Sequence, residues 1–165
     1  MIVALDVHYE DPDATAAAVV FAQWPDAEPA RELTARVEGV APYEPGAFFR
    51  RELPCLRAVL AKIDEPLETI VIDGYVWLGD TDHPGLGARL YDALDRKIPV
   101  VGVAKTPFHS MGAAISITRG QSANPLFVTA AGVDGNEAAR LVRAMHGPYR
   151  VPTLLARVDR LCRGL

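Results

Sequence analysis

Short apolar runs separated by turn residues dominate the first quarter of the chain. Residues 2–8 and 14–23 are almost continuously apolar, and residues 31–39 alternate between apolar and polar positions. Runs of this length and period predict β-strands. The stretches between them, EDPDA and WPDAEP, have the proline and acidic residues that are typical of turns. We therefore expect three consecutive antiparallel strands joined by short turns.

The pattern changes after residue 40. Residues 49–63 repeat apolar positions at intervals of three and four, which predicts a helix with Pro54 near its first turn, where proline is tolerated. Later apolar runs predict strands at 68–73, 98–104 and 124–131, and amphipathic runs predict helices at 84–97, 135–145 and 153–163. The expected fold class is α/β: a mixed sheet of three antiparallel strands followed by strand–helix alternation, with helices on both faces.

Length and composition narrow the class of protein. A chain of 165 residues suits one domain, residues 1–165, and no apolar run reaches the roughly 20 residues of a membrane helix. Cys55 and Cys162 form no C-x-x-C pair, which is typical of a cytoplasmic protein with reduced thiols. The net charge of −4 argues against holding nucleic acid by bulk electrostatics, although bound metal would reverse the sign locally. We expect a cytoplasmic monomer with no membrane partner.

Two aspartates stand where the pattern predicts buried strands. Asp6 lies inside the first strand, and Asp73 ends the strand in the stretch VIDGYVW. If these strands are neighbours, the two carboxylates meet near the middle of the sheet and need a cation, and oxygen ligands favour Mg²⁺ or Mn²⁺. Glu52 and Asp159, on predicted helices, are further candidate ligands. The alternatives stay open: a turn or capping role for Asp73, a Lys or Arg partner for Asp6, and solvated helix faces for the other two.

Seven stretches, in order along nearly the whole chain, match motifs of one nuclease family. They are ALDVHY, PYEPGAFFRRELP, VIDGYVW, TDHPGLG, IPVVGVAK, NPLF and PYRVPTLLARVD. The motifs that they match include D-V-x-Y, V-D-G-H-G, I-P-T-I-G-V-A-K and N-P-L-F. The chain therefore resembles the endonuclease V family. The order of strands and the strand-end acid also resemble ribonuclease H-like nucleases, so this is the fold that the resemblance implies.

The resemblance implies a metal-dependent endonuclease of DNA repair that acts near deaminated bases such as inosine, in DNA or in RNA. It implies a set of metal-binding and catalytic acids, for Mg²⁺ or alternatively Mn²⁺: Asp6, Glu52, Asp73 and Asp159. It places two catalytic basic residues, Lys105 and His83, near the scissile phosphate. It assigns nucleic-acid binding to a wedge-and-pocket set: Tyr43, Pro45, Gly46, Tyr75 and Phe108.

The departures from the family motifs surround the implied base pocket. Tyr75 and Val76 stand where the family has His and Gly, and Gly85 and Leu86 stand where it has a basic pair. The acids and the lysine are kept, so we expect metal-dependent cleavage with weak, salt-sensitive DNA binding. Two other functions remain open: a nucleic-acid-binding module without cleavage, and a metal-dependent phosphohydrolase for a small substrate.

Overall fold

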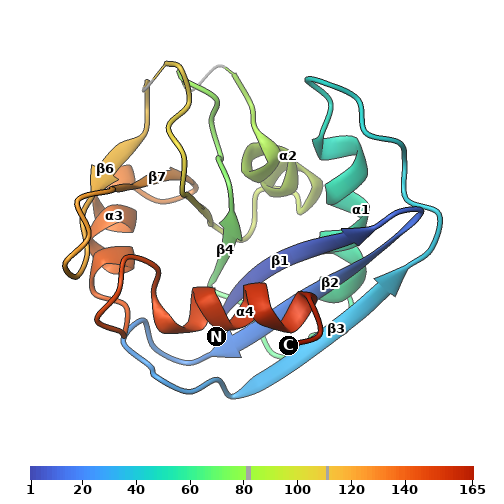
Figure 1. Ribbon diagram of the computed structural model, residues 1–165, viewed down its shortest axis with the longest axis horizontal. Helices are drawn as coiled ribbons and strands as arrows, with labels where there is room; N and C mark the ends of the chain where they lie inside the picture. The colour runs from blue at the N-terminus through green and yellow to red at the C-terminus, as the bar shows by residue number, and fades with distance from the viewer. Residues whose placement is uncertain (81–82, 111) are drawn as a thin grey trace.

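A seven-stranded mixed sheet forms the centre of the computed structural model, which describes residues 1–80, 83–110 and 112–165 (Figure 1). The strands are β1 (Ile2–Glu10), β2 (Asp13–Phe21), β3 (Arg31–Val37), β4 (Thr69–Asp73), β5 (Val100–Ala104), β6 (Ile115–Ile117) and β7 (Leu126–Ala131). Their order across the sheet is β3-β2-β1-β4-β5-β7-β6. The first three strands pair antiparallel, β4 lies parallel to both β1 and β5, and β7 is antiparallel to its two neighbours.

Helices cover both faces of this sheet. Among the described residues, α1 (Phe49–Leu60) and α2 (Leu86–Ala93) pack on one face, and α3 (Gly135–Arg143) and α4 (Thr153–Cys162) pack on the other. Alternate residues of β1 supply the two cores: Val3 and Leu5 face α1, whereas Ile2 and Ala4 face α4. A strand with both faces covered must be apolar at successive positions, which explains the continuous runs in the sequence. The ribonuclease H-like α/β fold expected from the sequence is confirmed.

The structure corrects the expected position of Pro54. This proline is the sixth residue of α1 and therefore lies past the first turn. Because proline has no N–H, the usual hydrogen bond to the carbonyl of Arg50 is missing, and the helix nevertheless continues to Leu60. Pro54 is exposed, so water can reach the carbonyl that loses its donor.

Two other elements differ from the expectation. The helix expected at 84–97 ends at Ala93, because Asp95 and Arg96 adopt the left-handed conformation, with φ of 56° and 57°. β6 was not expected, since three residues are too few to show a strand period. No helix of the described residues is long and apolar enough to cross a membrane.

Candidate active site

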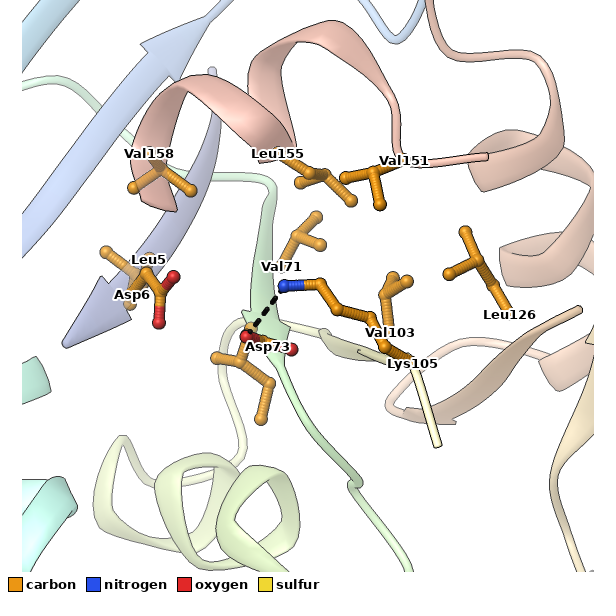
Figure 2. Close-up of a pocket in the computed structure, with 11 residues that line it drawn as sticks. Leu5, Asp6, Val71, Asp73, Val103, Lys105, Leu126, Val151, Leu155 and Val158 are labelled. Atoms are coloured by element: carbon orange, nitrogen blue, oxygen red, sulfur yellow. Dashed lines mark hydrogen bonds and ion pairs between the residues drawn. The ribbon is translucent and has the colours of Figure 1, made fainter. Parts of the chain in front are cut away.

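The register of two parallel strands brings Asp6 and Asp73 together. Leu5 of β1 pairs with Ile72 of β4, so the next position on each strand places Asp6 beside Asp73. Neighbouring strands lie about 4.8 Å apart. Alternation along the strands turns both side chains toward the face that α4 covers (Figure 2). The two carboxylates therefore meet near the middle of the sheet, where β4 ends and β1 continues to Glu10.

Lys105 reaches this pair from the end of β5. Its ammonium nitrogen lies 3.2 Å from a carboxylate oxygen of Asp73 (Figure 2). The two side chains are 39% and 40% exposed, so the ion pair is open to a ligand. Beside it lies a cavity of about 20 Å³, walled partly by Val103, Leu126 and Leu155, with room for about one water molecule. These apolar walls limit the solvent that screens the charges of the cluster.

Asp159 approaches Asp6 from α4. Ligand atoms of Asp6, Asp159 and Cys162 lie within 4.8 Å of one another. The thiol of Cys162 donates a hydrogen bond to the carbonyl oxygen of Asp159 at 3.1 Å, and its pKa is raised to about 12, first by burial and then by Asp6. A neutral thiol is a poor ligand for a hard cation, so the carboxylates are the relevant donors. The carboxylate of Asp159 also pairs with Arg163 at 3.0 Å.

Glu52 projects into the same region from the first turn of α1 and is only 7% exposed. Its pKa is raised to about 8, first by burial and then by the carboxylates of Asp6 and Asp73, whereas Arg51 lowers it. The pKa of Asp6 is raised to about 7 by burial and by Asp73. The backbone N–H of Val7, which donates to the Asp6 carboxylate at 2.8 Å, lowers that pKa only in part. Both carboxylates thus lie where their charged forms are unfavourable.

The donor set of this cluster fits a divalent cation. Among the described residues, neither Asp6 nor Glu52 forms an ion pair, although both are nearly buried beside two further acids. A cation would offset the mutual repulsion of these carboxylates and bring their pKa values down. Carboxylate oxygens without a thiolate or imidazole partner suit Mg²⁺ or Mn²⁺.

A pocket of about 240 Å³ opens next to the cluster, between α1 and α2. Glu52 and Asp73 line it together with aromatic rings, including that of Phe49. Two of the residues to which the motif resemblance assigns nucleic-acid binding, Gly46 and Tyr75, line it. A concave site with apolar walls and a few polar groups is typical of a ligand pocket.

The other residues assigned to nucleic-acid binding or catalysis lie around this pocket. Tyr43 and Pro45 are exposed in the loop before α1, and the ring of Tyr43 meets that of Phe48 edge-on at 6.0 Å. His83 lines a separate open groove of about 380 Å³ together with Phe108. The structure therefore brings Lys105 and the acids together, and places His83 in the neighbouring groove.

Tyr75 ties the loop after β5 to the end of β4. Its hydroxyl donates to the carbonyl oxygen of Thr106 at 2.8 Å and accepts from the backbone N–H of Phe108 at 3.0 Å. The rings of Tyr75 and Phe108 also contact each other, with centroids 6.1 Å apart. Because Thr106 directly follows Lys105, these contacts of Tyr75 fix the backbone on the C-terminal side of the lysine.

Known proteins with the same fold and related sequences identify the family. The family model of endonuclease V matches residues 1–124. A curated endonuclease V from Streptomyces avermitilis is 31% identical over an alignment of 186 positions, which covers 98% of this chain and 79% of the relative. The chain belongs to the endonuclease V family. A second relative in the family, the endonuclease V of Streptomyces coelicolor, is 30% identical and aligns with 98% of this chain and 77% of its own length.

Solved structures of endonuclease V share the fold. The crystal structure of the Streptomyces avermitilis protein superposes with a TM-score of 0.79 at 29% identity and covers 99% of this chain and 79% of its own. Endonuclease V from Ciona intestinalis, in complex with a 23mer DNA containing an inosine followed by a ribo-adenosine, gives a TM-score of 0.81 at 17% identity, with coverages of 99% and 83%. The crystal structure of human ENDOV gives a TM-score of 0.80 at 21% identity and covers 99% of this chain and 82% of its own. At these last two identities the likeness concerns the fold alone.

Two arginines without a role in the sequence-based interpretation support Lys105 in this endonuclease V fold. The guanidinium of Arg150 donates to the carbonyl oxygens of Lys105, Asn124 (3.0 Å) and Pro125 (2.8 Å), and so joins the ends of β5 and β7. Arg119, which is buried, donates to carbonyls of the 143–150 segment, including that of Arg150 at 3.4 Å. Arg150 lies in a stretch that matches a family motif, which was a usable signal. Nothing in the pattern around Arg119 indicated its role.

Arg51 is a third residue that sequence reasoning left out. It directly precedes Glu52 on α1 and is buried, its guanidinium lies 4.0 Å from the centre of the Tyr9 ring, and it pairs with Asp11. Arg51 therefore fixes the first turn of α1 against the end of β1, which also carries Asp6. Its place beside the motif acid was the available signal.

Proposed function

We propose that this protein is a Mg²⁺- or Mn²⁺-dependent endonuclease that hydrolyses a phosphodiester bond near a deaminated base, such as inosine, in DNA repair. The observation that carries the proposal is the convergence of four carboxylates from β1, β4, α1 and α4 beside a lysine. Family membership supports the nuclease activity. The inosine-containing DNA bound to the Ciona intestinalis relative supports the choice of substrate.

Asp6 and Asp73 are the proposed principal ligands, because they lie side by side and Asp6 lacks any other counterion among the described residues. Asp159 and Glu52 approach from opposite faces of the sheet and would complete the ligand set, directly or through water. A bound divalent cation would activate water and offset charge on the phosphate oxygens. Since ligation requires deprotonated carboxylates, the raised pKa values of Asp6 and Glu52 make binding weaker below about pH 7.

Lys105 is the proposed electrostatic partner of the reacting phosphate. Its ammonium group is held beside Asp73 by the 3.2 Å ion pair, and it is accessible to a ligand. From there it can donate to a phosphate oxygen on which negative charge grows during the reaction. The loop-anchoring contacts of Tyr75 and Arg150 reduce the movement of the lysine backbone.

The pocket between α1 and α2 is the proposed site for the deaminated base. A base that leaves the helix stack needs a concave site with aromatic walls, and a mispaired base costs less to extrude. Gly46 and Tyr75 line this pocket. The exposed Tyr43 lies on the adjoining loop, where its ring can stack in the space that the extruded base leaves in the nucleic-acid helix. His83 and Phe108 line the neighbouring groove, which extends the contact surface for the strand.

The test is a cleavage assay on matched DNA and RNA oligonucleotides with and without inosine, in Mg²⁺, Mn²⁺ or EDTA. We expect metal-dependent cleavage of the inosine strands, and a loss of at least about 100-fold for Asp73→Asn, which keeps the size of the side chain but weakens ligation. Asp92→Asn is the matched control, since Asp92 is exposed on α2 and, among the residues that the structure describes, pairs only with Arg96.

Three results would contradict the proposal. Cleavage by Asp73→Asn at the wild-type rate would remove the metal role of this residue. Metal-independent binding of inosine strands without any cleavage would favour a binding module. Hydrolysis of a small phosphodiester such as bis(p-nitrophenyl) phosphate, with no action on any strand, would favour a small-substrate phosphohydrolase.

A further inference from the structure

Arg89 lines the pocket between α1 and α2, which Glu52 and Asp73 also line. It is an exposed residue of α2, and its guanidinium carbon lies 3.8 Å from the centre of the Phe49 ring on α1. Contact at this distance is a cation–π interaction, which restrains the guanidinium over the ring. The Phe49 ring therefore limits the movement of the N–H donors of Arg89 at the pocket wall.

The donors of Arg89 are not used by carboxylates of the protein. Other arginines pair with acids, for example Arg31 with Glu65 at 2.8 Å and Arg140 with Glu137. Within residues 1–80, 83–110 and 112–165, Arg89 forms no such ion pair. A guanidinium has five N–H donors and no acceptor, so those facing the pocket are free to bind acceptor atoms of a ligand.

Charges of both signs line the pocket. Its two carboxylates, Glu52 and Asp73, belong to the proposed metal cluster, and among the described lining residues Arg89 is the only cationic side chain. A planar ligand in this pocket meets guanidinium donors at Arg89, so its acceptor edge should face that side chain.

We propose that Arg89 is a specificity-determining residue, which donates to the keto oxygen O6 and to the ring nitrogen N7 of the base in this pocket. Deamination replaces an exocyclic amino group, a donor, with a keto oxygen, an acceptor. Arginine binds an O6/N7 edge through two hydrogen bonds, whereas the amino group of adenine at the same place would face donors. Guanine also carries this edge, so Arg89 selects against adenine and not against guanine. This inference rests on the proposed function.

The experiment compares single-turnover cleavage of three otherwise identical strands that carry hypoxanthine, unsubstituted purine (without the 6-oxygen) or adenine at one position. Wild type should cut the hypoxanthine strand roughly 5- to 100-fold faster than the purine strand. Arg89→Met should reduce this ratio to nearly one, because the hypoxanthine strand loses the contacts to both O6 and N7, whereas the purine strand loses only the contact to N7. Arg89→Lys should restore a part of the ratio, because lysine keeps the charge but not the planar fork.

Arg140→Met is the matched control, because Arg140 is an exposed helical arginine on α3 and its only ion-pair partner in the described part of the chain is Glu137. It should leave the ratio unchanged. The ratio of two substrates on one enzyme does not depend on the fraction of enzyme that is folded, so partial loss of stability in a variant does not alter it.

Two results would overturn the role of Arg89 while the proposed function stands. An unchanged ratio in Arg89→Met would show that the arginine does not read the base. Loss of a phosphate contact would instead slow cleavage of all three strands equally. Arg89→Lys would then recover the full rate, and the slope of log binding constant against log salt concentration would be shallower by about one in Arg89→Met. A wild type that does not distinguish hypoxanthine from adenine at all would contradict both the role and the proposed base specificity.

Discussion

The carboxylate cluster and the pocket beside it share Glu52 and Asp73 but are built in different ways. Strands and helices position the acids: Asp6 and Asp73 follow from the pairing of β1 with β4, and Asp159 from a helix packed on the same face. Loops and side-chain contacts shape the pocket, through Gly46 and the Tyr75 hydroxyl. The departures from the family motifs fall in the pocket. The difference indicates that the chemistry and the choice of base can vary separately.

The largest expected effect concerns the cluster alone and is a dependence of stability on pH. The pKa values of Asp6 and Glu52 are raised from 3.8 to about 7 and from 4.5 to about 8. The folded protein therefore holds protons that the unfolded chain releases near pH 4, so the contribution of these two groups to metal-free stability is full below about pH 4 and falls as the pH rises to 8. We expect a loss on the order of 2–4 kcal/mol in the free energy of unfolding, measured in urea with EDTA.

The comparison predicts which variants change this pH dependence. Glu52→Gln should reduce the difference between pH 5 and pH 8, and Mg²⁺ should remove most of it. Arg89→Met, in the pocket, should leave it as in wild type. The acids with lowered pKa values, Glu65 and Glu137, titrate below pH 5 and do not contribute to this range. A metal-free protein that becomes more stable toward pH 8 would contradict the electrostatics of the cluster.

Lys105→Met should lower kcat about 100-fold with little change in KM, because the ammonium group acts on charge that grows during the reaction. Lysine also lowers the pKa of Asp6, so its removal should shift the acid limb of the pH–rate profile to higher pH. Single-turnover kinetics between pH 6 and pH 9 measure both effects. A rise in KM with unchanged kcat would assign Lys105 to ground-state binding instead.

Arg150→Met should lower kcat by roughly 10-fold, since the lysine would be displaced but not removed. Three carbonyl oxygens, including that of Lys105, lose their donor in this variant, so the unfolding free energy should also fall by about 1–3 kcal/mol. The effect on kcat is separated from the effect on stability by measuring the pH–rate profile at a temperature where the variant is fully folded. A wild-type kcat under those conditions would leave Arg150 with a role in stability only.

The smallest expected effect is that of Tyr75→Phe, which removes both hydrogen bonds of the hydroxyl and keeps the ring. We expect a change in cleavage of about 2- to 5-fold and a stability loss of about 1 kcal/mol. The Mn²⁺ affinity, measured by calorimetry, should stay that of wild type. A large loss of metal affinity would show that the pocket and the cluster are not separable.

The sequence predicted the strands, because strand period is a local property. It predicted the meeting of Asp6 with Asp73 only on the condition that their strands are neighbours, and the pairing of β1 with β4 in the structure meets that condition. It also placed Glu52 and Asp159 on helices, and the structure brings both to the cluster. The stack of Arg89 on Phe49 could not be predicted in this way. It joins residues forty positions apart through loops whose path depends on tertiary packing.

Side-chain hydrogen bonds to distant carbonyls were also beyond the sequence. Arg150 and Arg119 read as surface charges in a linear pattern, and only the folded chain shows that their donors hold the ends of strands and the segment before α4. The position of His83 illustrates the same limit. The motif resemblance puts it near the scissile phosphate without indicating its neighbours, and the structure places it in the groove with Phe108.

The pairing of β1 with β4 has a consequence for how this protein can vary over time. Strands shift against each other only by whole residues, and a shift by one would turn Asp6 to the opposite face of the sheet. The spacing of the two acids therefore cannot drift by small steps: descendants of this chain either keep it or lose it. The pocket has no such constraint, since each loop side chain can change by itself, so the substrate can diverge gradually around an unchanged pair of aspartates.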